Sequence, residues 1–385
     1  MLRWCLALLL PACTEPYSPA PISSPPNYLV VDGFINPLGM TTIRLSRTYA
    51  IASKAAPPAE TRATVYIEDD GGARYPLRET VAGTYASASA LVLNTTRKYR
   101  LHLNTQGGKE YASDYVPAKI TPPIDAVNWR AESTGLDIYV NAHDAANATQ
   151  YYRWEYAETW EIRSPYSPSV EYVNGAMRPI AVPFPGVCWG NAASSAVQID
   201  KTTALSQDVV ANYRLRRLPP SSELLYSRYS ILVQQYALTK EEYAYWELLR
   251  KNTESIGSLF DPQPAQLTGN VRSLSSSADL ALGFVGVHSR TEKRIFISRQ
   301  DLPGTWRLLS GYEGCLPPDT ISLYPPVPRP PLPADILRGA FGSPDYIPVD
   351  PYTGASGRVD GYTAKSRGCI DCRTRGTSVK PSYWP

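Results

Sequence analysis

Short runs of alternating apolar and polar residues constrain this fold more than any other feature of the sequence. Such alternation is typical of half-buried β-strands, whose successive side chains point to opposite faces. In the first third of the chain, strand runs occupy residues 28–35, 41–46, 63–68, 99–104 and 110–113. Asp-Asp-Gly-Gly at 69–72 and Gly-Gly at 107–108 are turn sequences between them. These features predict an immunoglobulin-like β-sandwich over residues 28–119, which closes where prolines cluster at 117–123.

A second, larger β-rich domain is expected over residues 120–385. Its strand runs occupy residues 124–130, 136–141, 151–162, 224–238, 281–287 and 294–298. The long run at 151–162 places Tyr152, Trp154, Tyr156 and Trp160 on one face, which we interpret as a core face. From Pro317 to Pro333 proline dominates, so this stretch is expected to be a surface loop.

One amphipathic helix is predicted within the second domain, near residues 240–256. Thr239 and Glu242 have the spacing of a capping box, in which the Thr hydroxyl meets the amide of Glu242 and the Glu carboxylate reaches back to the first amide. Gly257 would end the helix. The apolar residues that recur on one face are Tyr243, Trp246, Leu249 and Ile256. The fold class is therefore mainly β with one inserted helix.

The N-terminus has the features of an export signal. A Met-Leu-Arg start precedes an apolar stretch at 4–12, and Cys13 follows the small residue Ala12. This arrangement is similar to a bacterial lipobox and predicts a signal peptide at 1–12 and lipidation of Cys13. Residues 13–27 are rich in Pro and Ser and predict an extended tether. Apolar segments elsewhere are shorter than the roughly 20 residues that a membrane-spanning helix needs.

Four cysteines remain after Cys5 in the signal and Cys13 at the lipid site: Cys188, Cys315, Cys369 and Cys372. An even number of thiols in an exported chain favours two disulfides, and three connectivities are possible. One of these pairs Cys369 with Cys372 and Cys188 with Cys315. The C-x-x-C spacing at 369–372 leaves a zinc site or a redox site as alternatives. We favour structural disulfides and predict no bound metal.

Composition and motifs argue for binding rather than catalysis. The net charge of +3 is too small to indicate a nucleic-acid partner. The sequence contains no Gly-x-Ser-x-Gly, His-Glu-x-x-His or phosphate-binding loop, and we expect His102, His143 and His288 to be structural. We therefore predict no catalytic residues and no cofactor. Twenty-seven tyrosines and eight tryptophans could supply recognition surfaces.

An ordered series of short motifs resembles one known family. The motifs are the lipobox with Tyr17, Leu-Val-Val-Asp-Gly at 29–33, Val-Cys-Trp at 187–189, residues 229–238, Tyr243 and Trp246, Phe-Asp-Pro-Gln-Pro at 260–264, Gly-Asn at 269–270, Gly283, residues 293–297, Cys-Ile-Asp-Cys-Arg at 369–373 and Lys-Pro-Ser-Tyr-Trp at 380–384. The chain resembles the Bacteroidota cell-envelope lipoproteins that share domain of unknown function 4249. This sequence departs from the family pattern at 284–287, which is less aromatic, and at Tyr383, where phenylalanine is common.

The resemblance implies a two-part β-rich lipoprotein, often encoded beside a TonB-dependent outer-membrane receptor. It carries no established activity. The expected function is that of an accessory binding partner of such a receptor in substrate capture or uptake. The expected location is the cell-surface side of the outer membrane, with interface anchors around residues 160–189 and 260–270. The alternative is a passive cell-envelope scaffold or adhesin.

Overall fold

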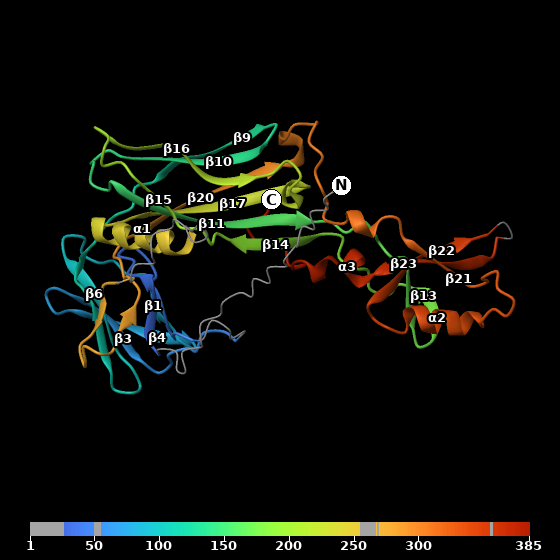
Figure 1. The fold of residues 1–385 in the computed structure, drawn as a ribbon, viewed down its shortest axis with the longest axis horizontal. Coiled ribbons are helices and arrows are strands. Elements are labelled where there is room, and N and C mark those ends of the chain that lie inside the picture. Colours follow the sequence, from blue (N-terminus) through green and yellow to red (C-terminus); the bar gives the residue numbers. More distant parts are fainter. Residues whose placement is uncertain (1–26, 50–54, 255–266, 268, 355–356) are drawn as a thin grey trace, which may run out of the picture.

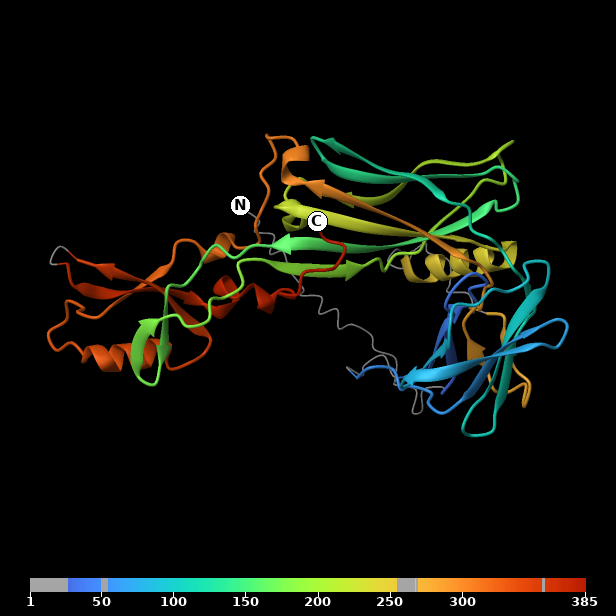
Figure 2. The same ribbon diagram turned by 180° about the vertical axis from the view of Figure 1, so that it is seen from behind.

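A computed structural model describes residues 27–49, 55–254, 267, 269–354 and 357–385. The described chain is mainly β, as the sequence predicted, and forms three parts (Figure 1). A curled N-terminal sheet lies against a two-sheet sandwich, and an elongated arm projects from the opposite end of the sandwich (Figures 1 and 2). Within these residues no helix is long and apolar enough to cross a bilayer.

The N-terminal part is one ten-stranded sheet. Its strands run in the order β18-β7-β6-β3-β4-β5-β2-β1-β19, and β8 pairs with β6. The strands are β1 (Leu29–Phe34), β2 (Thr42–Arg47), β3 (Thr64–Asp69), β4 (Arg74–Val81), β5 (Thr84–Ser87), β6 (Lys98–Asn104), β7 (Glu110–Ser113), β8 (Val116–Pro117), β18 (Val271–Ser273) and β19 (Ala281–Leu282). The end strands β18 and β19 contact each other, so the sheet curls around its own core. This arrangement is compatible with the predicted sandwich.

Two strands of this sheet come from late in the chain. β18 pairs antiparallel with β7, and β19 pairs parallel with β1. Val271 and Val285 are buried in the same core as Leu29 and Tyr111. The apolar face of the N-terminal strands is therefore completed by a segment about 150 positions further along, after the helix.

The middle part is a sandwich of two antiparallel sheets that share one core (Figure 1). One sheet has the order β16-β10-β9, and the other has the order β14-β11-β17-β20, with β15 beside β11. The strands are β9 (Ile124–Glu132), β10 (Gly135–Asp144), β11 (Tyr151–Ile162), β14 (Cys188–Ala193), β15 (Gln198–Lys201), β16 (Asp208–Leu218), β17 (Arg228–Ala237) and β20 (Arg290–Ser298). The 3-10 turns η1 (Glu223–Leu225) and η2 (Arg299–Asp301) flank β17 and β20.

The aromatic face of β11 is a core face, as predicted. Tyr152 and Trp154 are fully buried, Tyr156 is nearly so, and Trp160 packs at the edge of the same cluster. The buried polar atoms have partners: the indole N–H of Trp154 donates to Gln235 Oε1 at 2.9 Å. Alternation along the strand leaves Arg153 and Glu155 on the opposite face, toward the N-terminal sheet.

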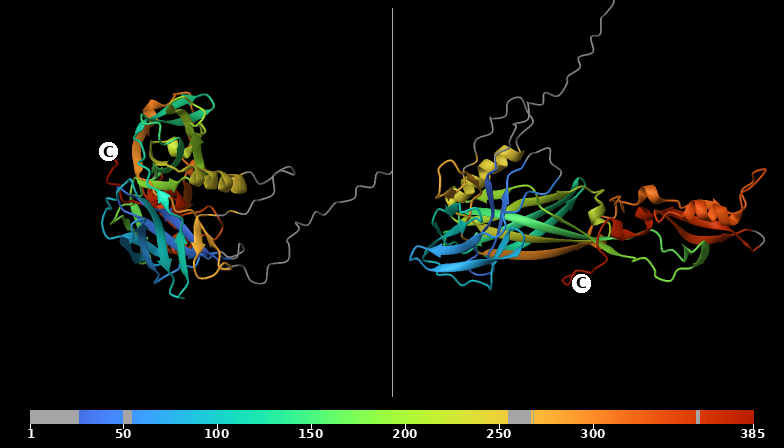
Figure 3. Two further views of the ribbon diagram at one scale, coloured as in Figure 1. Left: turned by 90° about the vertical axis from the view of Figure 1, so that its left-hand side faces the viewer. Right: turned by 90° about the horizontal axis from the view of Figure 1, so that it is seen from below.

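The arm is built from two excursions of the chain out of the sandwich. The first lies between β11 and β14, and the second follows η3 (Figures 1 and 3). Its elements are β12 (Val170–Val173), β13 (Ala176–Pro179), η3 (Glu313–Cys315), β21 (Asp319–Ser322), α2 (Pro333–Phe341), β22 (Tyr346–Thr353), β23 (Val359–Ser366), α3 (Arg367–Ile370) and η4 (Cys372–Thr374). β23 is the central strand between β21 and β22.

The arm contains more regular secondary structure than the sequence predicts. The stretch from Pro317 to Pro333 is not simply a loop, because it contains β21 and ends where α2 begins. Proline is accepted at the first helical position, where its missing N–H has no partner to lose, so Pro333 starts a helix. The described residues therefore contain α2 and α3 in addition to the one helix predicted.

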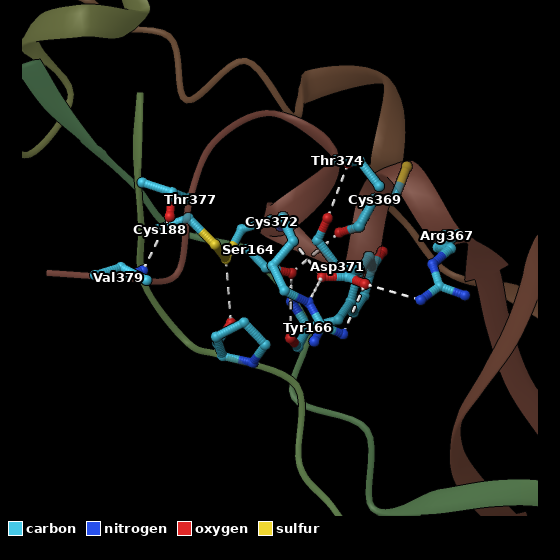
Figure 4. Close-up of a disulfide and its surroundings, with 12 residues drawn as sticks. Ser164, Tyr166, Cys188, Arg367, Cys369, Asp371, Cys372, Thr374, Thr377 and Val379 are labelled. Atoms are coloured by element: carbon cyan, nitrogen blue, oxygen red, sulfur yellow. Dashed lines mark hydrogen bonds and ion pairs between the residues drawn. A yellow bond between two sulfur atoms is a disulfide. The ribbon is translucent and has the colours of Figure 1, made fainter. Parts of the chain in front are cut away.

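Two disulfides lie where the arm joins the sandwich. Cys188 pairs with Cys372 (Figure 4). Cys315 pairs with Cys369. The pairing in two bridges agrees with the sequence expectation, but the possible connectivity Cys369–Cys372 is not the one found. Cys369 lies in α3 and Cys372 begins η4, and each reaches a different segment of the arm base. All four thiols are engaged in bridges, so none of them is a free zinc ligand or redox thiol.

The predicted helix is present as α1 (Lys240–Glu254), between the N-terminal sheet and the sandwich (Figure 1). The Glu242 amide donates to Thr239 Oγ1 at 3.2 Å, which is the first half of the predicted capping box. The second half is wrong, because one oxygen of the Glu242 carboxylate meets a histidine and the other has no hydrogen-bond partner. Ile256, Gly257, the signal peptide and Cys13 lie outside the described residues, as does the predicted tether apart from Asn27.

Candidate ligand-binding cleft

A cleft of about 330 Å³ lies between the N-terminal sheet, the sandwich and α1. Three elements meet there. β1 and β2 supply one wall, β11, β17 and β20 supply the second, and α1 with the segment after β19 supplies the third. Ligand pockets are commonly found at such junctions between structural units and start at roughly this size. The cleft is lined by both charge signs and by five aromatic rings: Phe34, Tyr236, Tyr245, Trp246 and Phe284.

Arg153 organises the sandwich wall of the cleft. Its guanidinium carbon lies 3.9 Å from the ring centre of Trp246 and 5.0 Å from that of Tyr236. It also forms an ion pair with Glu155, whose other oxygen accepts from the Tyr236 hydroxyl at 2.8 Å. Burial raises the pKa of Tyr236, and the negative charge of Glu155 adds to this effect, so the hydroxyl stays a donor. Arg153, Glu155 and the Tyr236 hydroxyl are therefore each other's polar partners.

Glu242 and Trp246 present polar atoms that have no hydrogen-bond partner among the described residues. They lie four positions apart on α1 and therefore share one face of the helix. Oε2 of Glu242 is an acceptor and Nε1 of Trp246 is a donor, and both atoms are buried. Burying a polar atom without a partner costs about 1–3 kcal/mol, so such atoms in a cleft indicate where a bound group would be stabilised.

His288 holds the other oxygen of Glu242. Its Nε2 lies 3.2 Å from Glu242 Oε1, and the histidine is completely buried. The imidazole stacks on Phe34 of β1 with ring centres 4.4 Å apart. The backbone at His288 connects the segment before β20 to the residue that follows β1, since the His288 amide donates to Ile35 O at 3.0 Å. The contact with His288 therefore orients the Glu242 carboxylate at the junction of the three walls of the cleft.

The mouth of the cleft carries an acid and a base side by side. Asp32 on β1 and Arg44 on β2 are directly opposite each other in the antiparallel register, and both are exposed. Neither has an ion pair with another described residue. Tyr245 of α1 lies nearby; burial raises its pKa, and the charge of Asp32 raises it further. The mouth therefore offers a carboxylate, a guanidinium and a protonated phenol.

The remaining histidines are held by carboxylates far from the cleft. His102 Nε2 lies 2.6 Å from Glu110 Oε1, and its ring stacks on Tyr66. His143 Nδ1 lies 2.8 Å from an oxygen of Asp125 on the surface. In the part of the chain that the structure describes, no group of three or more His, Cys, Asp or Glu side chains has a metal-binding arrangement.

The predicted interface anchors lie in different settings. Residues 160–189 run through the arm: Trp160 is half-buried at the sandwich edge, and Trp189 is buried beside the C-terminal tail. Most of 260–270 lies outside the described residues.

The cleft itself was not predicted from the sequence. The sequence predicts a capping role for Glu242 and a structural role for His288, and neither prediction indicates a cleft.

A comparison with curated proteins gives no significant match. A family model described as domain of unknown function DUF4249 matches residues 14–294. This range contains every residue of the cleft, whereas the cysteine and tryptophan motifs at 369–384 lie beyond it. The matched range is most of the chain, and the protein therefore belongs to the DUF4249 family.

Proposed function

We propose that this protein is an outer-membrane lipoprotein, anchored through Cys13, that captures a ligand as the accessory partner of a TonB-dependent receptor. The observation that carries this proposal is the cleft, in which Glu242 and Trp246 keep buried polar atoms without partners. A ligand that forms hydrogen bonds with these two atoms would remove the cost of burying them without partners. The resemblance of the sequence to cell-envelope lipoproteins encoded beside such receptors supports the choice of partner.

The arm is the part of the molecule best suited to contact a receptor. It projects away from the cleft and exposes large apolar side chains, among them Val182 (79% exposed) and Leu332 (69% exposed). Two disulfides stiffen its base, which reduces the entropy lost on binding. A stable complex with a receptor would bury about 1,600 Å² or more. The proposed orientation is on the cell-surface side, with 13–27 as the tether.

Affinity purification of the tagged protein from detergent-solubilised outer membranes tests the proposal. We expect a β-barrel receptor to co-purify with the wild type, and much less of it with the double variant Val182→Asp/Leu332→Asp. Val92→Asp is the matched control, since Val92 is 87% exposed but lies on the N-terminal part. If no receptor co-purifies and deletion leaves uptake of every tested nutrient unchanged, the scaffold or adhesin function replaces this proposal.

A further inference from the structure

The groups of the cleft that remain uncommitted come in two donor–acceptor pairs. At the mouth, Arg44 and Asp32 face each other across β1 and β2. Trp246 and Glu242 also line the cleft, and their Nε1 and Oε2 atoms supply a second donor and a second acceptor that have no hydrogen-bond partner among the described residues. The other charged lining groups are engaged: Arg153 with Glu155, and Arg290 with Glu292 at 2.8 Å. A ligand must therefore offer an acceptor and a donor at each of two positions.

The charge pattern argues against strongly charged ligands of one sign. The lining holds three arginines and three carboxylates, so its formal charge is balanced: Arg44, Arg153, Arg290, Asp32, Glu155 and Glu242. A phosphate or another multivalent anion would meet Asp32 at the mouth and Glu242 inside the cleft. Both carboxylates would repel its negative charge. A polycation would meet the arginines in the same way.

The aromatic rings argue against a neutral sugar stacked on an open ring face. Trp246 is covered on one face by the Arg153 guanidinium, and Phe34 is covered by His288. Tyr245 packs against both Trp246 and Phe284. These contacts show that the rings pack against other side chains of the cleft walls.

We propose that the cleft binds short peptides with free ends. The ammonium group would meet Asp32, the terminal carboxylate would meet Arg44, and an internal amide would donate to Glu242 Oε2 while its carbonyl accepts from Trp246 Nε1. A peptide is a small, net-neutral molecule that carries donors and acceptors in alternation, which is the pattern of the uncommitted groups. This inference rests on the proposed capture function and names its substrate class.

Isothermal titration of the full-length mature protein in detergent tests the assignment. The probes are trialanine, trilysine, triglutamate and leucylglycylglycine, with maltotriose and inorganic phosphate as competing classes. We expect at least one tripeptide to bind, and N-acetylation or C-amidation of that peptide to weaken binding about tenfold or more, because each removes a charge-assisted hydrogen bond. Arg44→Gln and Asp32→Asn should have effects of the same size. Both positions are exposed, so folding should be retained, and thermal unfolding checks this.

Arg78→Gln is the matched control, because Arg78 is an exposed arginine of the same sheet that does not line the cleft. Absence of binding by all four tripeptides at millimolar concentration overturns the peptide assignment. Peptide binding that is insensitive to both mouth variants overturns it as well. Maltotriose or phosphate binding that is lost in Arg44→Gln also overturns the peptide class, while it leaves ligand capture intact. Peptide binding without a co-purifying receptor supports this inference and counts against the receptor partnership.

Discussion

Cys188 and Cys372 are 184 residues apart in the sequence, and their disulfide brings their Cα atoms to 5.7 Å. Cys188 begins β14, where the first excursion of the arm returns to the sandwich, and Cys372 follows α3, where the second excursion returns. The bridge therefore joins the two return points of the arm. Cys315 and Cys369 join the outgoing and returning segments of the second excursion alone.

The two bridges are expected to contribute unequally to stability. In the chain-entropy model the stabilisation grows with the logarithm of the closed loop, and the sequence separations are 184 and 54 residues. The difference amounts to about 1 kcal/mol in favour of Cys188–Cys372. Urea unfolding of Cys188→Ser/Cys372→Ser and Cys315→Ser/Cys369→Ser under non-reducing conditions measures it. Equal losses, or a larger loss for the shorter loop, would contradict the model.

Asp371 is expected to make the arm base sensitive to acid. The side chain is 2% exposed and accepts from Arg373 Nε at 2.7 Å and from Arg367 at 3.2 Å (Figure 4). The hydrogen bond from Arg373 lowers the pKa of Asp371. A lowered pKa in the folded state stabilises the protein above the ordinary carboxyl pKa, and this contribution disappears as the pH falls through the folded value.

The measurement compares wild type with Asp371→Asn between about pH 5 and pH 2. We expect the wild type to be the more stable protein at pH 5, and the difference in the free energy of unfolding to shrink toward pH 2. Asp335→Asn, at an exposed position on α2, is the control and should be close to wild type throughout. A difference that is constant with pH would show that the Asp371 charge is not the cause.

The strands were predictable where local alternation decides burial. β11 is a clear case, because Tyr152, Trp154 and Tyr156 alternate with polar residues and all three are core residues. The pairing of β18 and β19 with the N-terminal sheet was not predictable, because short strands of two and three residues carry no pattern that names a distant partner. The start of α2 at Pro333 was obscured by the high proline content around it.

The cleft was hidden from sequence reasoning for a related reason. Thr239 and Glu242 fit a capping box, and half of that box is present. What redirects the Glu242 carboxylate is His288, 46 positions away, which reaches it only because the segment between β19 and β20 runs along β1. Local patterns describe a helix start correctly and cannot report a tertiary partner of this kind.

Cys13 is predicted to be lipidated, with residues 1–12 absent from the mature protein. The prediction depends on the charged start, the apolar stretch and the small residue before the cysteine. Metabolic labelling with a fatty-acid probe should label wild type and leave Cys13→Ser unlabelled. Cys5→Ser is the control that retains Cys13. Equal labelling of wild type and Cys13→Ser would rule out this anchor.

The C-terminal tail is predicted to stabilise the outer face of the sandwich. Trp384 is 5% exposed, its indole N–H donates to Glu161 Oε1 at 3.0 Å, and its ring meets Phe296 edge-on. Trp384→Ala should cost about 3 kcal/mol or more, and Trp384→Phe should cost less because it keeps most of the apolar contact. Val379→Ala, at a residue that is 73% exposed, should be near neutral. If Trp384→Ala matches that control in urea unfolding, the tail does not contribute to stability.

Gly286 is predicted to be required for the position of the Glu242 carboxylate. A Cβ atom at Gly286 would lie closer than 3.0 Å to both carboxylate oxygens of Glu242, so Gly286→Ala requires this buried carboxylate to move. Overpacking of this kind costs about 1–3 kcal/mol. Gly304→Ala is the matched control, since a Cβ there meets no atom within 4 Å.

A double-mutant cycle separates this clash from a general backbone effect. Removing the carboxylate with Glu242→Ala also removes the atoms that the new methyl group would strike. Gly286→Ala should therefore destabilise the wild type but cost much less in the Glu242→Ala background, with a coupling free energy of about 1 kcal/mol or more. Thermal and urea unfolding of the four proteins measure the cycle. Additive effects would mean that Gly286 is needed for its backbone alone, and the close approach to Glu242 would then have no energetic consequence.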